Sequence, residues 1–204
     1  MLIVAASVVQ GQSPALNRES RALLQGALTD FEAKKYDDAL AKLTEANQKM
    51  PDDPAVLNLL GAAHTKKKNF AAAKQYFDRA LAKQPGFFPA KFNVGELLFL
   101  EGRYAEARGF FAQMLRDDPA NELLQFKVFL CELQLGDPDS VTKALKAIRY
   151  PGNTPAWYFG QAVWQLKYGN KKKALEYVNG ARFIFGTKTV LFEETCHDIG
   201  LDIR

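Results

Sequence analysis

A spacing pattern that recurs every 34 residues constrains this chain more than any other feature. The aromatic residues Tyr36, Phe70 and Tyr104 lie 34 residues apart. An alanine follows each of them after three residues and a proline after fifteen, as Ala39 and Pro51 follow Tyr36. A repeat of this length is typical of paired helices that stack on their neighbours. The spacing therefore predicts an all-α solenoid of helical hairpins.

The apolar residues inside each repeat follow the same prediction. They recur at the i, i+3 and i+4 positions of an amphipathic helix, as Leu24, Ala27 and Leu28 do. Prolines and glycines mark the helix ends, and no run alternates as a half-buried strand would. A fourth, weaker copy passes through Gly136, and a fifth hairpin follows Pro155. We predict a domain at residues 19–204, with hairpins at about 20–53, 54–87, 88–121, 122–154 and 155–188 and a capping helix at 189–199.

The residues that would carry chemistry are few and scattered. The chain has two histidines, His64 and His197, and no HExxH motif, glycine-rich phosphate loop or CxxC pair. We therefore expect no enzyme, no cofactor and no metal site. Cys131 and Cys196 lie among apolar neighbours, which favours two buried thiols, with a disulfide as the alternative. The net charge is +4, but no helix gathers lysine and arginine on one face, so we expect no nucleic-acid partner.

The first residues differ in kind from the rest. Residues 2–9 form a short apolar run, followed by a small-residue cleavage site at residues 9–11. The run is too short to span a bilayer, so no stable membrane span is expected. We interpret residues 1–18 as the remnant of a secretory signal and a frayed N-terminus, which predicts an exported, periplasmic or envelope-associated protein. The alternative is a cytoplasmic protein in which this run belongs to the fold or to a tag.

Residues in several repeats resemble the tetratricopeptide repeat family in the same register. The resemblance spans about residues 19–188, although Phe129 and Pro138 depart from the pattern in the fourth copy. It implies a right-handed superhelical α-solenoid of about five helix-turn-helix hairpins, which binds proteins or peptides and does no chemistry of its own. The matching residues are Leu60, Gly61, Phe70, Ala73, Phe77, Ala80 and Pro85 in the second repeat, and Val94, Gly95, Gly102, Tyr104, Ala107, Phe111 and Pro119 in the third.

In this family the first helix of each hairpin lines a concave groove, and the resemblance carries its groove-facing positions onto this sequence. They are mostly apolar or aromatic here. Leu24, Leu28 and Phe92 stand where polar residues would clamp a carboxylate, so we reject that mode of binding. The expected peptide-binding groove consists of Leu24, Leu28, Phe31, Asn58, Phe92, Glu96, Phe99, Phe126, Leu130, Phe159 and Val163.

An apolar groove favours one function and leaves two alternatives open. The leading hypothesis is a non-enzymatic module that binds an apolar helix or an extended peptide, and acts as an envelope adaptor or assembly factor. In the first alternative the groove is filled by the protein's own side chains. In the second, copies of the chain associate through it into a structural homo-oligomer, because large apolar patches rarely stay open to water.

Overall fold

The computed structural model describes residues 18–198, 200 and 201. These residues form helices and no strand, which confirms the predicted all-α fold. They divide into two units, of which the first ends at Leu97 and the second begins at Leu98, inside one helix. Each unit is described by itself. The expected signal remnant at residues 1–18 lies almost wholly outside the described residues.

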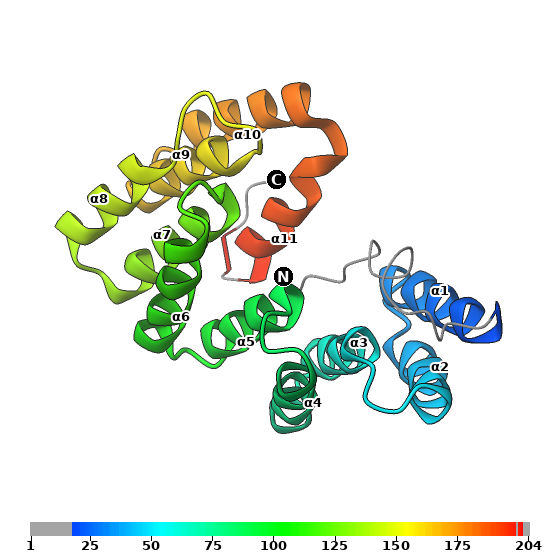
Figure 1. Ribbon diagram of the computed structural model, residues 1–204. Helices are drawn as coiled ribbons and strands as arrows, with labels where there is room; N and C mark the ends of the chain where they lie inside the picture. Colours follow the sequence, from blue (N-terminus) through cyan, green and yellow to red (C-terminus); the bar gives the residue numbers. More distant parts are fainter. Residues whose placement is uncertain (1–17, 199, 202–204) are drawn as a thin grey trace. The chain divides into compact units, whose positions relative to one another are not determined.

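The first unit contains two complete hairpins and most of a fifth helix (Figure 1). Apolar residues from successive helices meet in shared clusters, one of which includes Leu28, Leu43 and Leu60. Each hairpin therefore buries its apolar surface against its neighbour, as a helical repeat requires. The elements are α1 (Arg18–Glu32), α2 (Tyr36–Lys49), α3 (Pro54–Lys66), α4 (Phe70–Lys83) and α5 (Phe88–Leu100).

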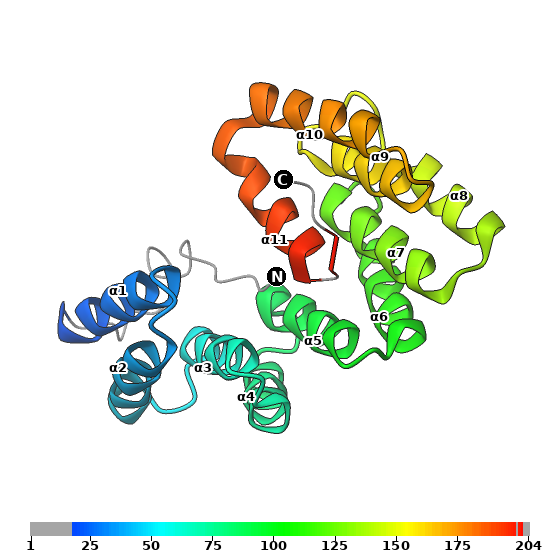
Figure 2. The ribbon, with the colours of Figure 1, turned by 180° about the vertical axis from the view of Figure 1, so that it is seen from behind.

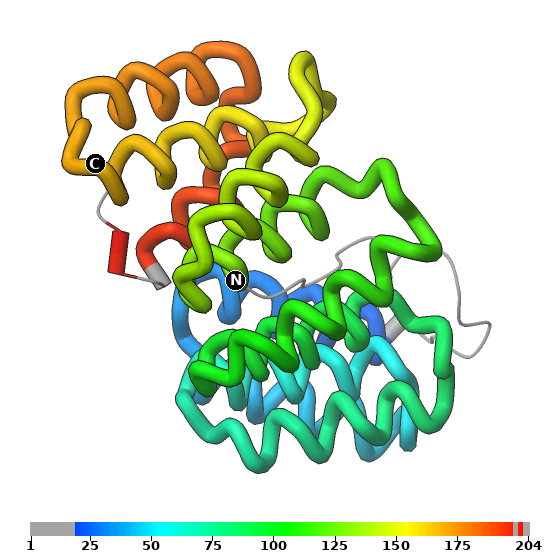
Figure 3. Tube along the Cα trace, turned by 90° about the vertical axis from the view of Figure 1, so that its left-hand side faces the viewer, coloured from blue at the N-terminus to red at the C-terminus, as the bar shows by residue number. Residues whose placement is uncertain are grey.

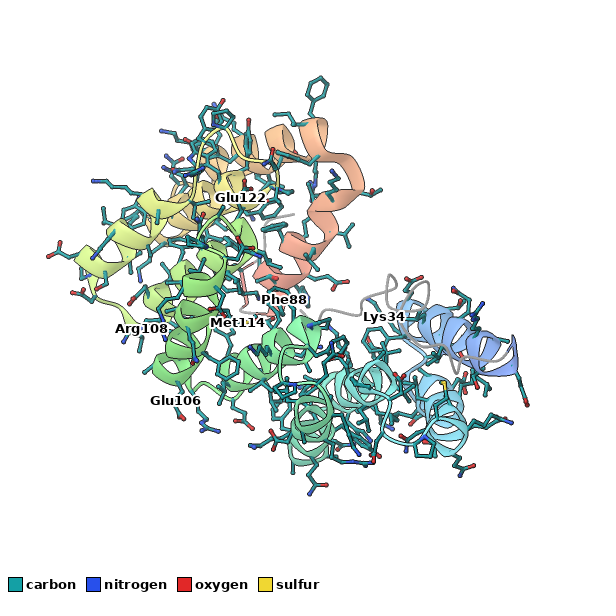
Figure 4. All side chains as sticks on the ribbon, viewed as in Figure 1. Lys34, Phe88, Glu106, Arg108, Met114 and Glu122 are labelled. Carbon is teal, nitrogen blue, oxygen red and sulfur yellow. The ribbon has the colours of Figure 1, made fainter. Side chains whose placement is uncertain are left out.

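The second unit begins with the end of α5 and continues the same alternation of helices (Figure 2). The guanidinium group of Arg108 on α6, labelled in Figure 4, lies 3.4 Å from the carboxylate of Glu132 on α7. This ion pair joins the two helices. The elements are α6 (Tyr104–Asp117), α7 (Glu122–Leu135), α8 (Pro138–Ala147), α9 (Ala156–Lys167), α10 (Lys171–Phe185), the short 3-10 helix η2 (Gly186–Thr189) and α11 (Val190–Asp198).

The helix starts follow the sequence signals. Asp53 caps α3 by accepting hydrogen bonds from the backbone N–H groups of Ala55 and Val56. Asp137 caps α8 in the same way through Ser140, and these hydrogen bonds lower the pKa of the Asp137 carboxyl. A proline follows each aspartate at the first helical position, where its missing N–H has no consequence. The two prolines therefore mark helix ends, as the sequence indicated.

The turn inside each hairpin places one residue in the left-handed region of backbone space. These residues recur with the period of the sequence repeat, and Figure 3 shows the chain reversing between successive helices. Glycine adopts this conformation without strain, but a residue with a Cβ atom does not. The five positions are Lys34 (φ 62°), Lys68 (φ 61°), Gly102 (φ 76°), Gly136 (φ 87°) and Gly169 (φ 75°).

We expect the substitution Lys68→Gly to raise the free energy of unfolding by about 0.5–1 kcal/mol. The left-handed conformation costs lysine about 1–2 kcal/mol, and this exceeds the entropy of about 0.5–1 kcal/mol that a glycine loses on folding. Urea unfolding followed by circular dichroism measures the difference. The control is Lys143→Gly inside α8, where glycine should lower stability by about 1 kcal/mol. A lower urea midpoint for Lys68→Gly would contradict the expectation.

Candidate partner-binding site

The expected groove residues of the first helix pack within the first unit. Leu24 and Leu28 are buried in the cluster that α1 forms with α2 and α3. Phe31 is partly buried against the same cluster, and its ring meets the ring of Tyr36 edge to face at 5.4 Å between centroids. These three side chains therefore contribute to the stability of the first hairpins.

The expected groove residues of α3 and α5 are also buried. Asn58 accepts a hydrogen bond of 2.9 Å from the side-chain amide of Asn93, which joins α3 to α5. Phe92 is fully buried and stacks on Phe88, with 6.1 Å between ring centroids. Glu96 is 1% exposed. A buried amide pair of this kind fixes the register of two helices, because each polar group would otherwise lose its hydrogen bonds to water.

In the second unit, α11 contacts two of the expected groove residues. Phe192 of α11 lies between Phe126 of α7 and Phe159 of α9, with ring centroids 5.2 and 5.5 Å away. Figures 1 and 2 both show α11 beside α7. We call the surface that includes Phe126, Leu130, Phe159 and Val163 the inner face; all four residues are fully buried. Phe99 is buried in the same unit and meets Tyr104 edge to face at 5.2 Å.

Two polar contacts fix α11 in this position. The ammonium group of Lys127 donates a hydrogen bond of 3.5 Å to the hydroxyl of Thr195. The guanidinium group of Arg182 donates a hydrogen bond of 2.9 Å to the carboxylate of Glu193, and this bond is the largest cause that lowers the pKa of Glu193. A carboxylate with a lowered pKa in the folded state stabilises that state above its ordinary pKa of about 4.3. The contact is lost as the pH falls through the lowered value.

In the structure, the inner face packs against α11 of the same chain. α11 is a short helix with Phe192 as its third residue, and an apolar helix is the kind of ligand that was expected from outside the chain. Phe192 was missed because α11 does not belong to a repeat, so no spacing rule indicates where its side chains point. The role of the groove residues in binding another protein stays a prediction, because every one except Phe31 is buried by the protein itself.

No group of three or more histidine, cysteine, aspartate or glutamate side chains among the described residues is arranged to hold a metal ion. Cys131 and Cys196 are buried and are not joined in a disulfide. Burial raises the pKa of the Cys196 thiol to about 12, so its reactive thiolate form is scarce at neutral pH. None of the helices in the described ranges is both long enough and apolar enough to cross a bilayer.

His64 lies at a packing position, and we expect it to make stability depend on pH. Its ring stacks on Tyr76 with 5.3 Å between centroids. Burial, and then the charge of Lys67, lower the pKa of His64 in the folded state. The unfolded chain therefore binds a proton more readily, and stability is fully present above a pH of about 6.5 and declines below it.

The substitution His64→Phe should remove the part of this decline that His64 causes. Urea midpoints at pH 7.5 and pH 5.5 measure the effect, and the difference between them should shrink in the variant. His197→Phe replaces the other of the chain's two histidines, which is exposed, and is the matched control. An unchanged pH dependence in His64→Phe would contradict the assignment.

Comparison with known proteins supports the assignment of helical repeats. Two family profiles described as tetratricopeptide repeat match residues 30–92 and 66–122. A human protein, Protein O-mannosyl-transferase TMTC2, is 32% identical over 87 residues, which are 41% of this chain and 10% of that protein. The chain thus spans about a tenth of the length of this curated relative.

Solved structures share the fold at low sequence identity. A TPR protein from Parabacteroides merdae has a TM-score of 0.73 at 17% identity, covering 88% of this chain and 70% of its own. A thermophilic TPR protein from Thermus thermophilus has a TM-score of 0.68 at 19% identity, covering 87% and 99%. PilW, described as a widely conserved type IV pilus biogenesis factor, has a TM-score of 0.65 at 19% identity, covering 91% and 88%. At these identities the similarity shows the fold alone.

Proposed function

Because the chain belongs to the tetratricopeptide repeat family, we propose that it is a non-enzymatic protein-interaction module that binds an apolar helix on its inner face. The observation that supports this is the place of α11. The contacts of Phe192 with Phe126 and Phe159 support an apolar helix as the ligand of this surface. Burying one such ring contributes about 1.5–3 kcal/mol. In our proposal a partner helix replaces α11, and the self-filled state is the resting state.

The role of an envelope adaptor or assembly factor is the finer part of this proposal. It rests on the apolar run at residues 2–9, which lies outside the described residues. The shared fold with a type IV pilus biogenesis factor is compatible with it. Cell fractionation and N-terminal sequencing of the mature protein test this part. A mature chain that begins near residue 12 in an envelope fraction supports export, and an intact chain in the cytoplasm contradicts it.

A synthetic copy of the chain's own last helix tests the binding mode. The probe is a fluorescein-labelled peptide of residues 186–201 with serine in place of Cys196. In the wild-type protein the attached α11 competes with it at a high effective concentration. The substitution Phe192→Ala weakens that competitor, so the peptide should bind at least tenfold more tightly, as measured by fluorescence polarisation. The same peptide with aspartate in place of Phe192 should not bind.

The control is Phe183→Ala. Phe183 lies on α10 and is 92% exposed, so the same chemical change leaves the inner face intact and should leave the affinity at the wild-type value. Labelling of Cys196 provides a second readout, because a bound peptide should displace α11 and expose this buried thiol. Equal peptide binding by wild-type and Phe192→Ala proteins would overturn the proposal.

Self-association into a structural subunit remains a second candidate because of one surface. Three large apolar side chains on either side of η2 are more than half exposed: Phe183 and Ile184 at the end of α10, and Val190 at the start of α11. Large exposed apolar residues favour contact with another protein surface. Sedimentation velocity at increasing concentration tests this candidate, and a monomer at every concentration would contradict it.

A further inference from the structure

A hollow lined by aromatic and basic side chains lies between α8 and α9, in the second unit. Its volume is about 630 Å³, which lies within the range of natural ligand pockets, about 300–1,000 Å³. We call it the aromatic pocket. The residues that matter for its chemistry are Lys146, Arg149, Tyr150, Trp157, Gln161 and Trp164.

The aromatic pocket is separate from the inner face. Trp157, Gln161 and Trp164 follow one another at i, i+4 and i+7, so they share one stripe of α9. Phe159 and Val163 belong to the inner face and lie on a different side of the same helix, about 100–160° from the three residues of this stripe at 100° per residue. An event at the aromatic pocket therefore does not require α11 to move, and this inference stands apart from the proposed function.

The rings of the pocket are open to a ligand. Tyr150 is 62% exposed, and its ring centroid lies 4.4 Å from that of Trp157. Trp157 also meets Tyr177 edge to face at 5.6 Å, which fixes the indole from behind. Trp157 and Trp164 are both partly exposed. Rings that are held by neighbours in this way present flat apolar surfaces at a low cost in conformational entropy.

The polar groups of the pocket are mostly hydrogen-bond donors. An indole, an ammonium group and a guanidinium group donate and do not accept, and these groups belong to Trp157, Trp164, Lys146 and Arg149. Lys146 and Arg149 are exposed, and no acidic side chain among the described residues forms an ion pair with either. A complementary ligand therefore offers acceptors and negative charge, and has few donors of its own.

We propose that the aromatic pocket binds an acidic, proline-rich segment of a partner protein in the polyproline II conformation. Prolines lack the backbone N–H, so such a segment presents carbonyl acceptors that it does not use internally. Its rings pack on aromatic grooves in the known mode of polyproline recognition. Acidic residues between the prolines are attracted to Lys146 and Arg149. Single-stranded nucleic acid fits less well, because its bases carry donors and it requires a continuous basic path.

The chain provides its own probe for this site, because its two tryptophans both line the pocket. Tryptophan fluorescence of the full-length protein should therefore change when the peptide Glu-Pro-Pro-Pro-Glu-Pro-Pro-Pro is added. A peptide with lysine in place of glutamate should bind at least tenfold more weakly. A peptide with glycine in place of proline should also bind at least tenfold more weakly, because it is not preformed in the polyproline II conformation.

Two variants locate the binding. The double variant Lys146→Glu with Arg149→Glu changes only exposed side chains. It should lower the affinity for the acidic peptide at least tenfold. Lys143→Glu on the same helix lies outside the pocket lining, and should leave the affinity within twofold of wild type. Absence of any fluorescence change, an equal affinity for the lysine peptide, or binding of oligouridine in preference to the acidic peptide would each overturn the proposal.

Discussion

Replacing Gly61 by alanine is expected to lower the free energy of unfolding by about 2–3 kcal/mol, although alanine is the better helix former. A Cβ atom on Gly61 would lie 2.5, 2.7 and 2.9 Å from three atoms of the Phe77 ring. Phe77 is fully buried in a cluster with Ala62, Ala73 and Leu97, so the ring has no free space to enter. Overpacking of this kind costs about 1–3 kcal/mol. If α3 moves away from α4 to relieve the clash, other packing contacts between the two helices are lost as well.

The matched control has the opposite sign. Gly109 lies in the interior of α6, and a Cβ atom there would meet nothing within 4 Å. Gly109→Ala should therefore raise stability by about 1 kcal/mol through helix propensity alone. A second control adds Phe77→Leu to Gly61→Ala, since a smaller side chain opposite the new methyl group should recover part of the loss. Urea unfolding measures all three, and a stabilised Gly61→Ala variant would contradict the close packing of α3 and α4.

Gly61 and Phe77 both belong to the residues that match the repeat pattern, and the structure brings them into close contact. The turn residues Lys34 and Lys68 recur at the same period, and they take the conformation that glycine takes later in the chain. In a repeat protein each hairpin packs mainly on its neighbours, so local spacing determines most contacts. The all-α class follows from that rule.

The repeat spacing predicted less about the candidate site. The positions of Phe126 and Phe159 were predicted, but their burial depends on Phe192, which follows the last repeat and obeys no period. Trp157 was not among the expected groove residues. Its part in the aromatic pocket depends on the path of residues 149–155, which lie in the connection between α8 and α9.

A second large effect on stability is expected at Glu122, which contacts this segment. Its carboxylate, labelled in Figure 4, accepts hydrogen bonds of 2.8 Å from the backbone N–H groups of Asn153 and Thr154, and another from the Thr154 hydroxyl. Hydrogen bonds to a charged group contribute about 1.5–3 kcal/mol. Glu122→Ala should therefore destabilise the segment before α9 by about 2–3 kcal/mol. Amide hydrogen exchange at Asn153 and Thr154 should become at least tenfold faster.

Three further variants separate this contact from a general loss of stability. Glu122→Gln keeps an acceptor oxygen of the same shape and should show a smaller effect. Gly152→Ala places a Cβ atom 2.8 Å from a Glu122 oxygen and should loosen the same segment while the carboxylate is retained. Glu176→Ala removes an exposed carboxylate from α10 and should change nothing. Since Arg149 and Tyr150 lie in the segment that Glu122 holds, Glu122→Ala should also lower the affinity for the acidic proline-rich peptide. Unchanged hydrogen exchange at Asn153 together with unchanged peptide affinity would show that the segment is held by other contacts.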